Sequence, residues 1–557
     1  MDSTVASISQ EGTEKIFSAT DAFPFLRMPV ELQHRVCALF CRHCLDGEAT
    51  PAAAMAQVAG LPFKTLKALS ETCHNLNKIA QPLLYHYPDV KSYTLFFKTI
   101  SSRPDLAASV RVLARLWESG RTTATIRSPR HDKEDLEYLK DLARRLHLDD
   151  ADDPNFDQCF EYLNESPDGD VDGYSNSMAR AALESLITAI HFTLTPKVQF
   201  LMIDLDDGRA IIRDRLLEDG SLLLPYPYLP KVVSTHPQHF HHLDTIVLRN
   251  TFHYNPDDLG LDRLCFLFET IPNIRRVFFE FLIGERPEGY IDRQSNHAEL
   301  EWKALPHMQE VYFDPCLRTN GAAPLEGIAS MLQLCTSLKK FTFRLKYPDE
   351  YQSACFSPSK LLEALLPTKN TLQHLELYCS LAKIPSFHKG TLLGCSLKEF
   401  SVLETLILDE ELFCRHWLLD SSDNSCDDSC ITDILPESVS FLAIRTHDKY
   451  KAVADLLRLA QRVNDGAFSR LSQLRVEVLH DIVIKEYSDG FNRNEDAFDA
   501  EYLLYHVPEE QWESTIRELA EHVGARVRET FQGTKVAVDV EFVFEPYPMS
   551  QYHYYNW

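Results

Sequence analysis

Residues 372–377 read Leu-Gln-His-Leu-Glu-Leu, with apolar side chains at the first, fourth and sixth positions. This template, with any apolar residue allowed, recurs at Leu243-Ile246-Leu248, Ile274-Val277-Phe279, Met308-Val311-Phe313, Leu338-Phe341-Phe343, Leu372-Leu375-Leu377, Leu403-Leu406-Leu408, Val439-Leu442-Ile444 and Leu471-Leu474-Val476. Successive copies begin 31, 34, 30, 34, 31, 36 and 32 residues apart. An earlier copy is Val198-Leu201-Ile203, and a partial one is Val110-Leu113. Self-similarity at such a period indicates stacked structural units.

Each copy is short and alternates in its second half, which predicts a β-strand. Helices are expected between the strands, at 258–269, 325–334, 358–366 and 451–462. A strand followed by a helix at fixed period resembles leucine-rich-repeat solenoids, which implies parallel strands on a concave face. The intervals exceed the ~20 to 29 residues usual for that family. A less regular α/β solenoid, or an ordinary α/β domain with coincidental spacing, stays open.

The N-terminal stretch Phe25-Leu26-Arg27-Met28-Pro29-Val30-Glu31-Leu32 predicts a helix that begins at Pro29 and exposes an apolar stripe. The stripe falls at i, i+4, i+7 and i+8 and consists of Leu32, Val36, Leu39 and Phe40. Gln33, His34 and Arg35 lie mostly on other faces. A second helical stretch carries Leu66, Leu69, Cys73, Leu76, Ile79 and Leu83.

Together these two segments resemble the F-box family. The family's Leu-Pro-x-Glu-Leu opening corresponds to Met28, Pro29, Glu31 and Leu32, and its later run corresponds to Leu69, Cys73, Leu76 and Ile79. The resemblance implies docking onto a Skp-family adaptor, and through it onto a cullin ligase core, while a protein substrate binds elsewhere. The residues expected against the adaptor are Met28, Pro29, Leu32, Val36, Leu69 and Leu76. The alternative is an ordinary amphipathic helical cap on the repeats.

The fold class expected is therefore α/β, with a helical F-box before an irregular leucine-rich-repeat-like solenoid. The segments are a disordered N-terminus at 1–21, the F-box at 22–90, the solenoid at 91–480 and a capping segment at 481–557. An acidic, breaker-rich insertion at about 118–176 interrupts the repeats. The last segment contains a helical stretch and an alternating strand, which would protect the final repeat.

The net charge and the hydropathy of the sequence indicate which classes of partner the chain is not expected to bind. The formal charge is −26 and the pI is near 5.3, which argues against nucleic acid. No run of eighteen apolar residues occurs, and the N-terminus lacks the pattern of a secretory signal. We expect a soluble cytoplasmic or nuclear protein that does not bind membranes.

The sequence carries no recognised catalytic motif, neither G-x-S-x-G nor a P-loop, G-x-G-x-x-G or H-E-x-x-H. The prediction is a non-enzyme without a cofactor that recruits substrates to a ubiquitin ligase. The alternative is a leucine-rich-repeat interaction scaffold unconnected to ubiquitination.

Two motifs could bind metals, and both are incomplete. Residues 168–173 match the start of an EF-hand loop, but position 12 is Ala179 instead of the bidentate carboxylate. Cys41-Arg42-His43-Cys44 has the spacing of half a zinc site, yet no second pair follows at finger spacing. The sequence therefore predicts no metal, with buried thiols at a helix end.

The substrate surface is expected on the third, fifth and seventh template positions, because these alternate with the core positions. Aromatic and arginine side chains among polar neighbours suit a protein partner. The residues chosen lie in the middle of the repeats, where curvature lets several strands touch one ligand: Arg276, Phe278, Tyr312, Arg344 and Tyr378.

Overall fold

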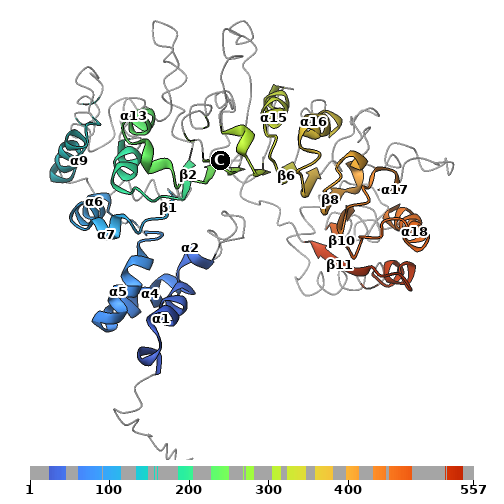
Figure 1. Cartoon of the computed structure of the whole chain (residues 1–557), viewed down its shortest axis with the longest axis horizontal. Coiled ribbons are helices and arrows are strands. Elements are labelled where there is room, and N and C mark those ends of the chain that lie inside the picture. Colours follow the sequence, from blue (N-terminus) through green and yellow to red (C-terminus); the bar gives the residue numbers. More distant parts are fainter. Residues whose placement is uncertain are drawn as a thin grey trace, which may run out of the picture. The chain divides into compact units, whose positions relative to one another are not determined.

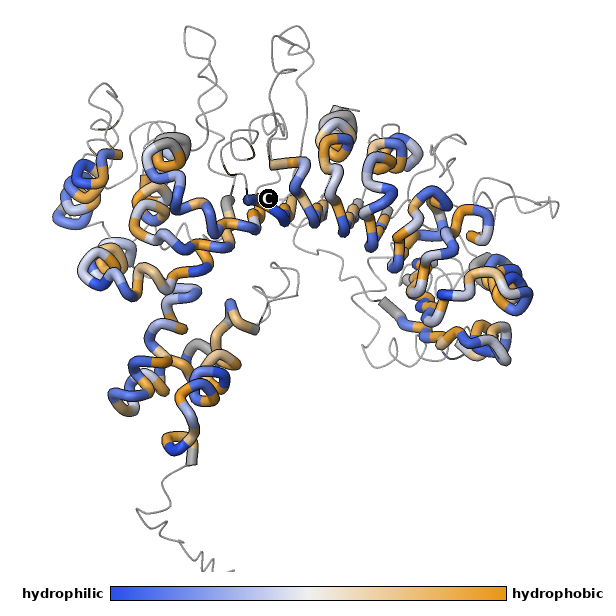
Figure 2. Tube along the Cα trace, in the orientation of Figure 1, coloured by the Kyte–Doolittle hydropathy of each residue, from blue (hydrophilic) through white to orange (hydrophobic). Residues whose placement is uncertain are grey.

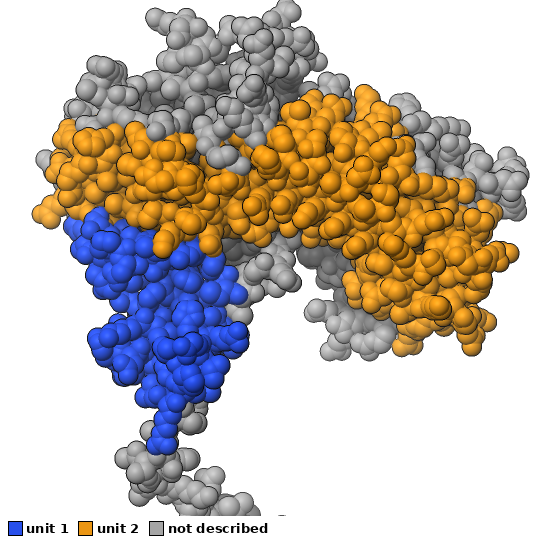
Figure 3. Space-filling model, viewed as in Figure 1, with its two compact units in different colours: residues 1–91, 98–112 blue, residues 92–97, 113–557 orange. Residues whose placement is uncertain are grey.

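A computed structural model of the chain divides into two compact units (Figure 3). Unit 1 comprises Met1–Lys91 and Lys98–Val112, and unit 2 comprises Ser92–Phe97 and Leu113–Trp557. The structure describes residues 24–45, 61–88, 90, 92–114, 133–148, 156, 160, 186–204, 228–249, 268, 271, 273–280, 304–314, 323–345, 358–379, 397–412, 431–446, 451–479, 521 and 524–543.

The described part of residues 24–107 is helical. Its elements are η1 (Pro24–Arg27), α1 (Val30–Ala38), α2 (Arg42–Leu45), α4 (Leu61–Thr72), α5 (His74–Leu84), α6 (Tyr93–Ser102) and α7 (Pro104–Ala107). Cys73 separates α4 from α5, because its extended backbone (φ −158°, ψ 161°) interrupts the helical path. In unit 1 the helices enclose a small apolar core of Phe25, Cys37, Cys41, Leu66, Leu76, Ile79, Ala80 and Leu83. Burial of this core holds α1, α4 and α5 together.

Unit 2 is organised by one eleven-stranded sheet whose strand order follows the sequence. The strands are β1 (Val112–Ala114), β2 (Phe200–Asp204), β3 (Thr245–Arg249), β4 (Arg276–Glu280), β5 (Glu310–Asp314), β6 (Lys340–Leu345), β7 (His374–Cys379), β8 (Thr405–Asp409), β9 (Phe441–Thr446), β10 (Gln473–Leu479) and β11 (Ala537–Val543). Neighbouring strands from β2 to β11 pair in parallel. The fold is therefore α/β with an open parallel sheet.

The described helices after β1 differ in length. They are α9 (Lys133–Arg145), α13 (Tyr228–Thr235), α15 (Ala323–Leu334), α16 (Pro358–Leu365), α17 (Ile431–Ile434) and α18 (Lys451–Asn464). Short 3-10 helices are η3 (Pro237–Phe240), η8 (Leu305–His307), η9 (Leu366–Thr368), η10 (Leu397–Glu399) and η11 (Glu410–Leu412). Within unit 2, α15, α16 and α18 lie on the same side of the sheet (Figure 1).

The template copies of the sequence are aligned across the sheet. The third position of each copy pairs with the third position of the next, as in Thr245 with Arg276 and Arg276 with Glu310. The first, fourth and sixth positions of all eight copies are 3 % exposed or less and form the core between sheet and helices. Hydrophilic and hydrophobic residues alternate along the strands (Figure 2). The eight template copies thus occupy equivalent positions in one sheet, which argues against the alternative that their even spacing in the sequence is a coincidence.

The sequence predicted these elements closely. All eight template copies are strands, and the earlier copies at 198–203 and 110–113 coincide with β2 and β1. The helices expected at 325–334, 358–366 and 451–462 correspond to α15, α16 and α18. The helix expected at 258–269 lies outside the described residues except for Phe268, as do the N-terminal segment 1–21, the EF-hand-like loop and most of the acidic insertion. None of the helices in the described ranges is long and apolar enough to cross a membrane.

The aromatic stack in the core gives a stability prediction. The ring of Phe313 stacks on that of Phe279, with 4.4 Å between centroids and 4° between planes. Phe313→Ala should lower the free energy of unfolding by about 3 to 5 kcal/mol, because it leaves a cavity in the stack. Leu457→Ala on α18 is the control, since this side chain is 51 % exposed and should cost under about 1 kcal/mol. Urea unfolding of both variants checks the prediction, and equal losses would contradict it.

Candidate functional site

Helix α1 turns its apolar stripe outward. Leu32 and Leu39 are 43 % and 61 % exposed, whereas Gln33 and Cys37 face the core at 7 % and 0 %. Val36 and Phe40 are partly buried against that core. The exposed stripe predicted from the sequence is therefore confirmed for Leu32 and Leu39 only, and Val36, which was expected against the adaptor, contacts the core instead. The burial of Gln33 was not expected, because a polar side chain was assigned to another face.

The buried side chain of Gln33 is hydrogen-bonded to the turn that precedes α1. Its Nε2 donates to the carbonyl oxygen of Met28 at 2.8 Å. The backbone N–H groups of Leu32 and Gln33 donate to the carbonyl of Pro29, which directly precedes α1. A buried amide that is hydrogen-bonded avoids most of the cost of leaving water. These contacts fix the rotation of α1 and thereby the outward direction of Leu32.

The residues expected against the adaptor do not all reach the surface. Met28 and Pro29 are exposed beside Leu32, and Leu69 is partly buried against the core. Leu76 is 5 % exposed and packs inside unit 1 with Leu66 and Ile79, so its assignment to the docking surface is wrong. The helical periodicity of α5 gave no sign of which of its leucines faces inward.

The third, fifth and seventh template positions form the second candidate surface, called here the inner face. The parallel register places Phe278 beside Tyr312 and Arg344 beside Tyr378. The Arg344 guanidinium carbon lies 5.4 Å from the centroid of the Tyr312 ring. The structure therefore brings the residues chosen from the sequence onto neighbouring strands.

The aromatic residues of the inner face are less accessible than the sequence suggested. Phe278 is 7 % exposed, Tyr312 9 % and Tyr378 2 %, so none of the three is an open anchor. They pack on one another and beneath arginine side chains, which cover aromatic rings well through their flat guanidinium groups. The accessible parts are the side chains of Arg276 and Arg344, at 36 % and 31 %.

A buried charge network lies at the centre of the inner face. Glu376 accepts a hydrogen bond from Nε of Arg344 at 2.8 Å, and the same oxygen lies 3.2 Å from Nη2 of Arg445. Nε of Arg445 donates to Glu477 on the next strand, β10. The guanidinium carbon of Arg445 also lies 4.8 Å from the centroid of the Tyr378 ring. Charged side chains from β6, β7, β9 and β10 are thus joined into one unit.

The network decides the charge state of its members. Burial alone would raise the pKa of the Glu376 carboxyl, but the neighbouring His374 ring and the Arg344 and Arg445 guanidiniums hold it far below its usual range. Burial would likewise lower the pKa of Arg445, and the carboxylates of Glu376 and Glu477 raise it instead. Glu376, Arg344 and Arg445 therefore stay ionised at neutral pH. Sequence periodicity places Glu376, Arg445 and Glu477 on this face, but only the structure shows their pairing.

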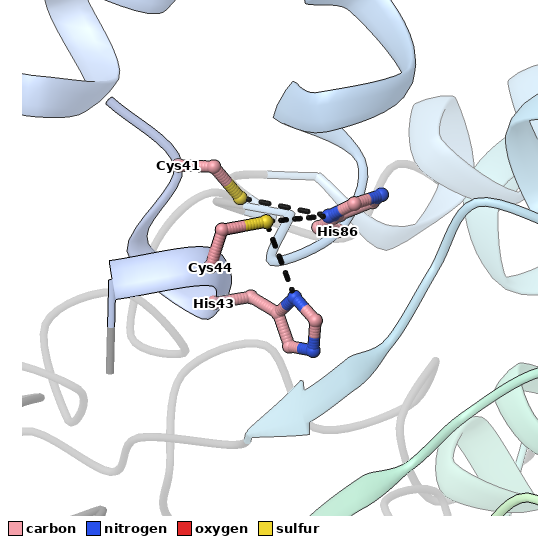
Figure 4. Close-up of side chains that lie close together, drawn as sticks. All are labelled: Cys41, His43, Cys44 and His86. Atoms are coloured by element: carbon pink, nitrogen blue, oxygen red, sulfur yellow. Dashed lines mark hydrogen bonds between the residues drawn. The ribbon is translucent and has the colours of Figure 1, made fainter. Parts of the chain in front are cut away.

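A third cluster lies in unit 1 and combines sulfur and imidazole groups. Sγ of Cys41 and Sγ of Cys44 lie 3.6 Å and 3.5 Å from Nδ1 of His86, and Sγ of Cys44 lies 3.7 Å from Nδ1 of His43 (Figure 4). We call these four residues the Cys/His cluster. The sequence showed only its first half, because His86 follows 42 residues after Cys44 and beyond two helices. Folding of α5 against α1 supplies the missing group.

Within the cluster the two thiols influence each other's acidity. The hydrogen bond between their sulfurs is the main reason that the pKa of Cys41 is raised and that of Cys44 lowered. Both imidazoles lower the pKa of Cys44 further. Cys44 is therefore the more acidic thiol of the pair.

No protein-family model, curated protein or solved structure matches this chain. Function is therefore inferred from the three groups of residues themselves: the outward stripe of α1, the inner face and the Cys/His cluster.

The charge network generates a prediction about pH. Glu376→Gln should lower the free energy of unfolding at pH 7 by about 3 kcal/mol, because the mostly buried Arg445 and the partly exposed Arg344 lose the carboxylate that they share. The pKa of Glu376 is depressed in the folded state, so its contribution is complete above about pH 5 and is lost as the pH falls. The gap between wild type and variant should consequently narrow below about pH 4.

Urea unfolding across this pH range measures that gap. Glu399→Gln is the matched control, since Glu399 pairs with Lys369 at 3.0 Å on the surface and its side chain is 57 % exposed. The control should change stability by less than about 1 kcal/mol. A gap for Glu376→Gln that stays constant with pH would refute the proposed ionisation.

Proposed function

We propose that this chain is a non-catalytic substrate-recruiting adaptor of a cullin-based ubiquitin ligase. Unit 1 contains an F-box that binds a Skp-family adaptor, and the leucine-rich-repeat-like strands of unit 2 bind a protein target. The observation that carries the proposal is the outward apolar stripe of α1. It follows an opening, Met28-Pro29-Val30-Glu31-Leu32, that resembles the F-box motif.

Exposing the apolar side chains of the stripe to water is unfavourable in free energy unless a partner covers them. Five of the eight large apolar side chains that are exposed in the described residues lie between Leu26 and Leu39. Contiguous exposed apolar groups of this kind mark protein interaction surfaces, whereas single ones are common on any protein. The five are Leu26, Met28, Val30, Leu32 and Leu39. Leu32 and Leu39, seven residues apart on one side of this helical segment, can fit an apolar surface on a partner together with Met28.

The inner face supports the second half of the proposal. Arg276 and Arg344 are partly exposed and held in place, Arg276 by Asp244 at 3.1 Å and Arg344 by Glu376. Arginines whose geometry is fixed before binding lose little conformational entropy when a partner arrives. The overall charge of −26 opposes a phosphate chain as the ligand. A polypeptide target that presents carboxylates or carbonyl oxygens to these guanidiniums fits the face.

The stripe predicts adaptor binding that depends on exposed leucine and methionine. Met28→Ala with Leu32→Ala should weaken binding of a Skp-family adaptor about 10- to 100-fold, because each change removes about 1 kcal/mol of apolar burial. Both side chains are exposed in the free chain, so the fold should not suffer. Calorimetric titration with the purified adaptor measures the change.

The matched control for the stripe is Leu334→Ala with Leu457→Ala, two exposed leucines of α15 and α18. This pair should leave adaptor affinity unchanged. If the wild-type chain does not bind the adaptor at all, the ligase proposal fails and the chain is better described as an interaction scaffold.

If the inner face binds the target, substitutions there should reduce target binding without reducing adaptor binding. Once a target is identified by co-purification, Arg276→Ala with Arg344→Ala should reduce its capture at least about tenfold while adaptor binding persists, since charge-assisted hydrogen bonds are removed from the target side only. Arg462→Ala with Arg470→Ala, two exposed arginines elsewhere in unit 2, should have no effect. Pull-down of both partners from one preparation compares the variants. Equal loss of adaptor and target would indicate misfolding instead of a lost target site.

A further inference from the structure

The Cys/His cluster has the dimensions of a tetrahedral metal site. Zinc binds Cys sulfur at ~2.3 Å and His nitrogen at ~2.05 Å, and at a tetrahedral angle these bonds place sulfur and nitrogen about 3.6 Å apart. Three sulfur–nitrogen distances in the cluster are 3.5, 3.6 and 3.7 Å. All four donor atoms lie within 4.8 Å of one another. We propose that this cluster binds one zinc ion.

The local backbone suits thiolate ligands. Cys41 lies between α1 and α2, and the N–H of Cys44 donates to the Cys41 carbonyl at 3.0 Å, which closes a tight turn between the two cysteines. Zinc would be bound by the two sulfurs as thiolates, with release of their thiol protons, and by both imidazoles as neutral ligands.

The second half of the site is held equally firmly. His86 follows α5, and its carbonyl accepts hydrogen bonds from the N–H groups of Arg111 and Val112 at 3.0 Å and 2.9 Å. Its ring meets that of His43 edge to face, with centroids 5.2 Å apart and an interplanar angle of 88°. Nδ1 of both rings therefore converges on the sulfurs from different sides (Figure 4). Converging, separately anchored donors are what a preorganised site requires.

A disulfide between Cys41 and Cys44 is the competing use of the same sulfurs. It would leave both imidazoles without a role, although their Nδ1 atoms lie within 3.7 Å of a sulfur. Cys and His donors in a four-coordinate arrangement are the set typical of structural zinc. Zinc here would join the end of α2 to the end of α5 and so reinforce the small core of unit 1. Small cores gain the most from such cross-links.

The test uses the full-length chain with its thiols reduced. The protein is loaded with zinc, dialysed and analysed for metal content, and we expect one zinc ion per chain. Cobalt(II) should replace zinc and give the intense visible bands of a tetrahedral site with a thiolate charge-transfer band in the near ultraviolet. Cys44→Ser and His86→Asn should each weaken zinc binding more than about 100-fold, measured by competition with a chelating dye.

The variants avoid Cys41, because that residue is also part of the core. His74→Asn is the matched control, since this exposed histidine begins α5 and lies outside the cluster. Cys44→His should keep zinc while the cobalt spectrum loses part of its thiolate band. Circular dichroism verifies that each variant is folded.

Three results would overturn the proposal. They are absence of zinc from the reduced, folded wild type, wild-type affinity in the Cys44→Ser, His86→Asn double variant, and a cobalt spectrum without thiolate bands. None of these results depends on whether unit 1 binds a Skp-family adaptor.

Discussion

Backbone pairing at the entry to each strand is the interaction on which unit 2 depends. The carbonyl oxygen of the second template position accepts two N–H groups from the next repeat, as Asp244 does from Arg275 and Arg276. The same pattern recurs from Gln199 to Ser440. Because each carbonyl fixes the start of the following strand, the register cannot slip between repeats. Without this alignment the apolar columns of the core would fall out of step with the helices that cover them.

The inner face follows from the same alignment. Parallel strands in register place equivalent positions side by side, so opposite charges of neighbouring repeats can pair. At the seventh position the signs alternate from Asp409 to Arg445 to Glu477. Arg445 also reaches back across β8 to Glu376. A buried network of this kind contributes more to a unique arrangement of side chains than to net stability.

The sequence predicted the strands and their register because both depend on apolar spacing alone. It did not predict how accessible each side chain is to solvent. The template indicates which face of the sheet a side chain lies on, but it does not show whether neighbouring side chains cover it. Phe278, Tyr312 and Tyr378 point away from the core as expected, yet neighbouring side chains bury them. Leu76 was assigned to the surface, but it is buried among the apolar residues of unit 1. His86 was missed because its contacts with Cys41 and Cys44 join segments that lie more than forty residues apart in the sequence.

Helix α1 shows why periodicity cannot decide which side of a helix is buried. In α18, Leu456, Leu459 and Ala460 have helical spacing and are buried. In α1 the comparable leucines are exposed, since the inward positions are taken by Gln33, Cys37 and Cys41, spaced four residues apart. The amide of Gln33 is satisfied only in the observed rotation, and the sulfur of Cys41 meets its partners only there. The hydrogen bonds of Gln33 therefore stabilise a rotation of α1 in which Cys37, Val36 and Phe40 contact the core while Leu32 and Leu39 remain exposed.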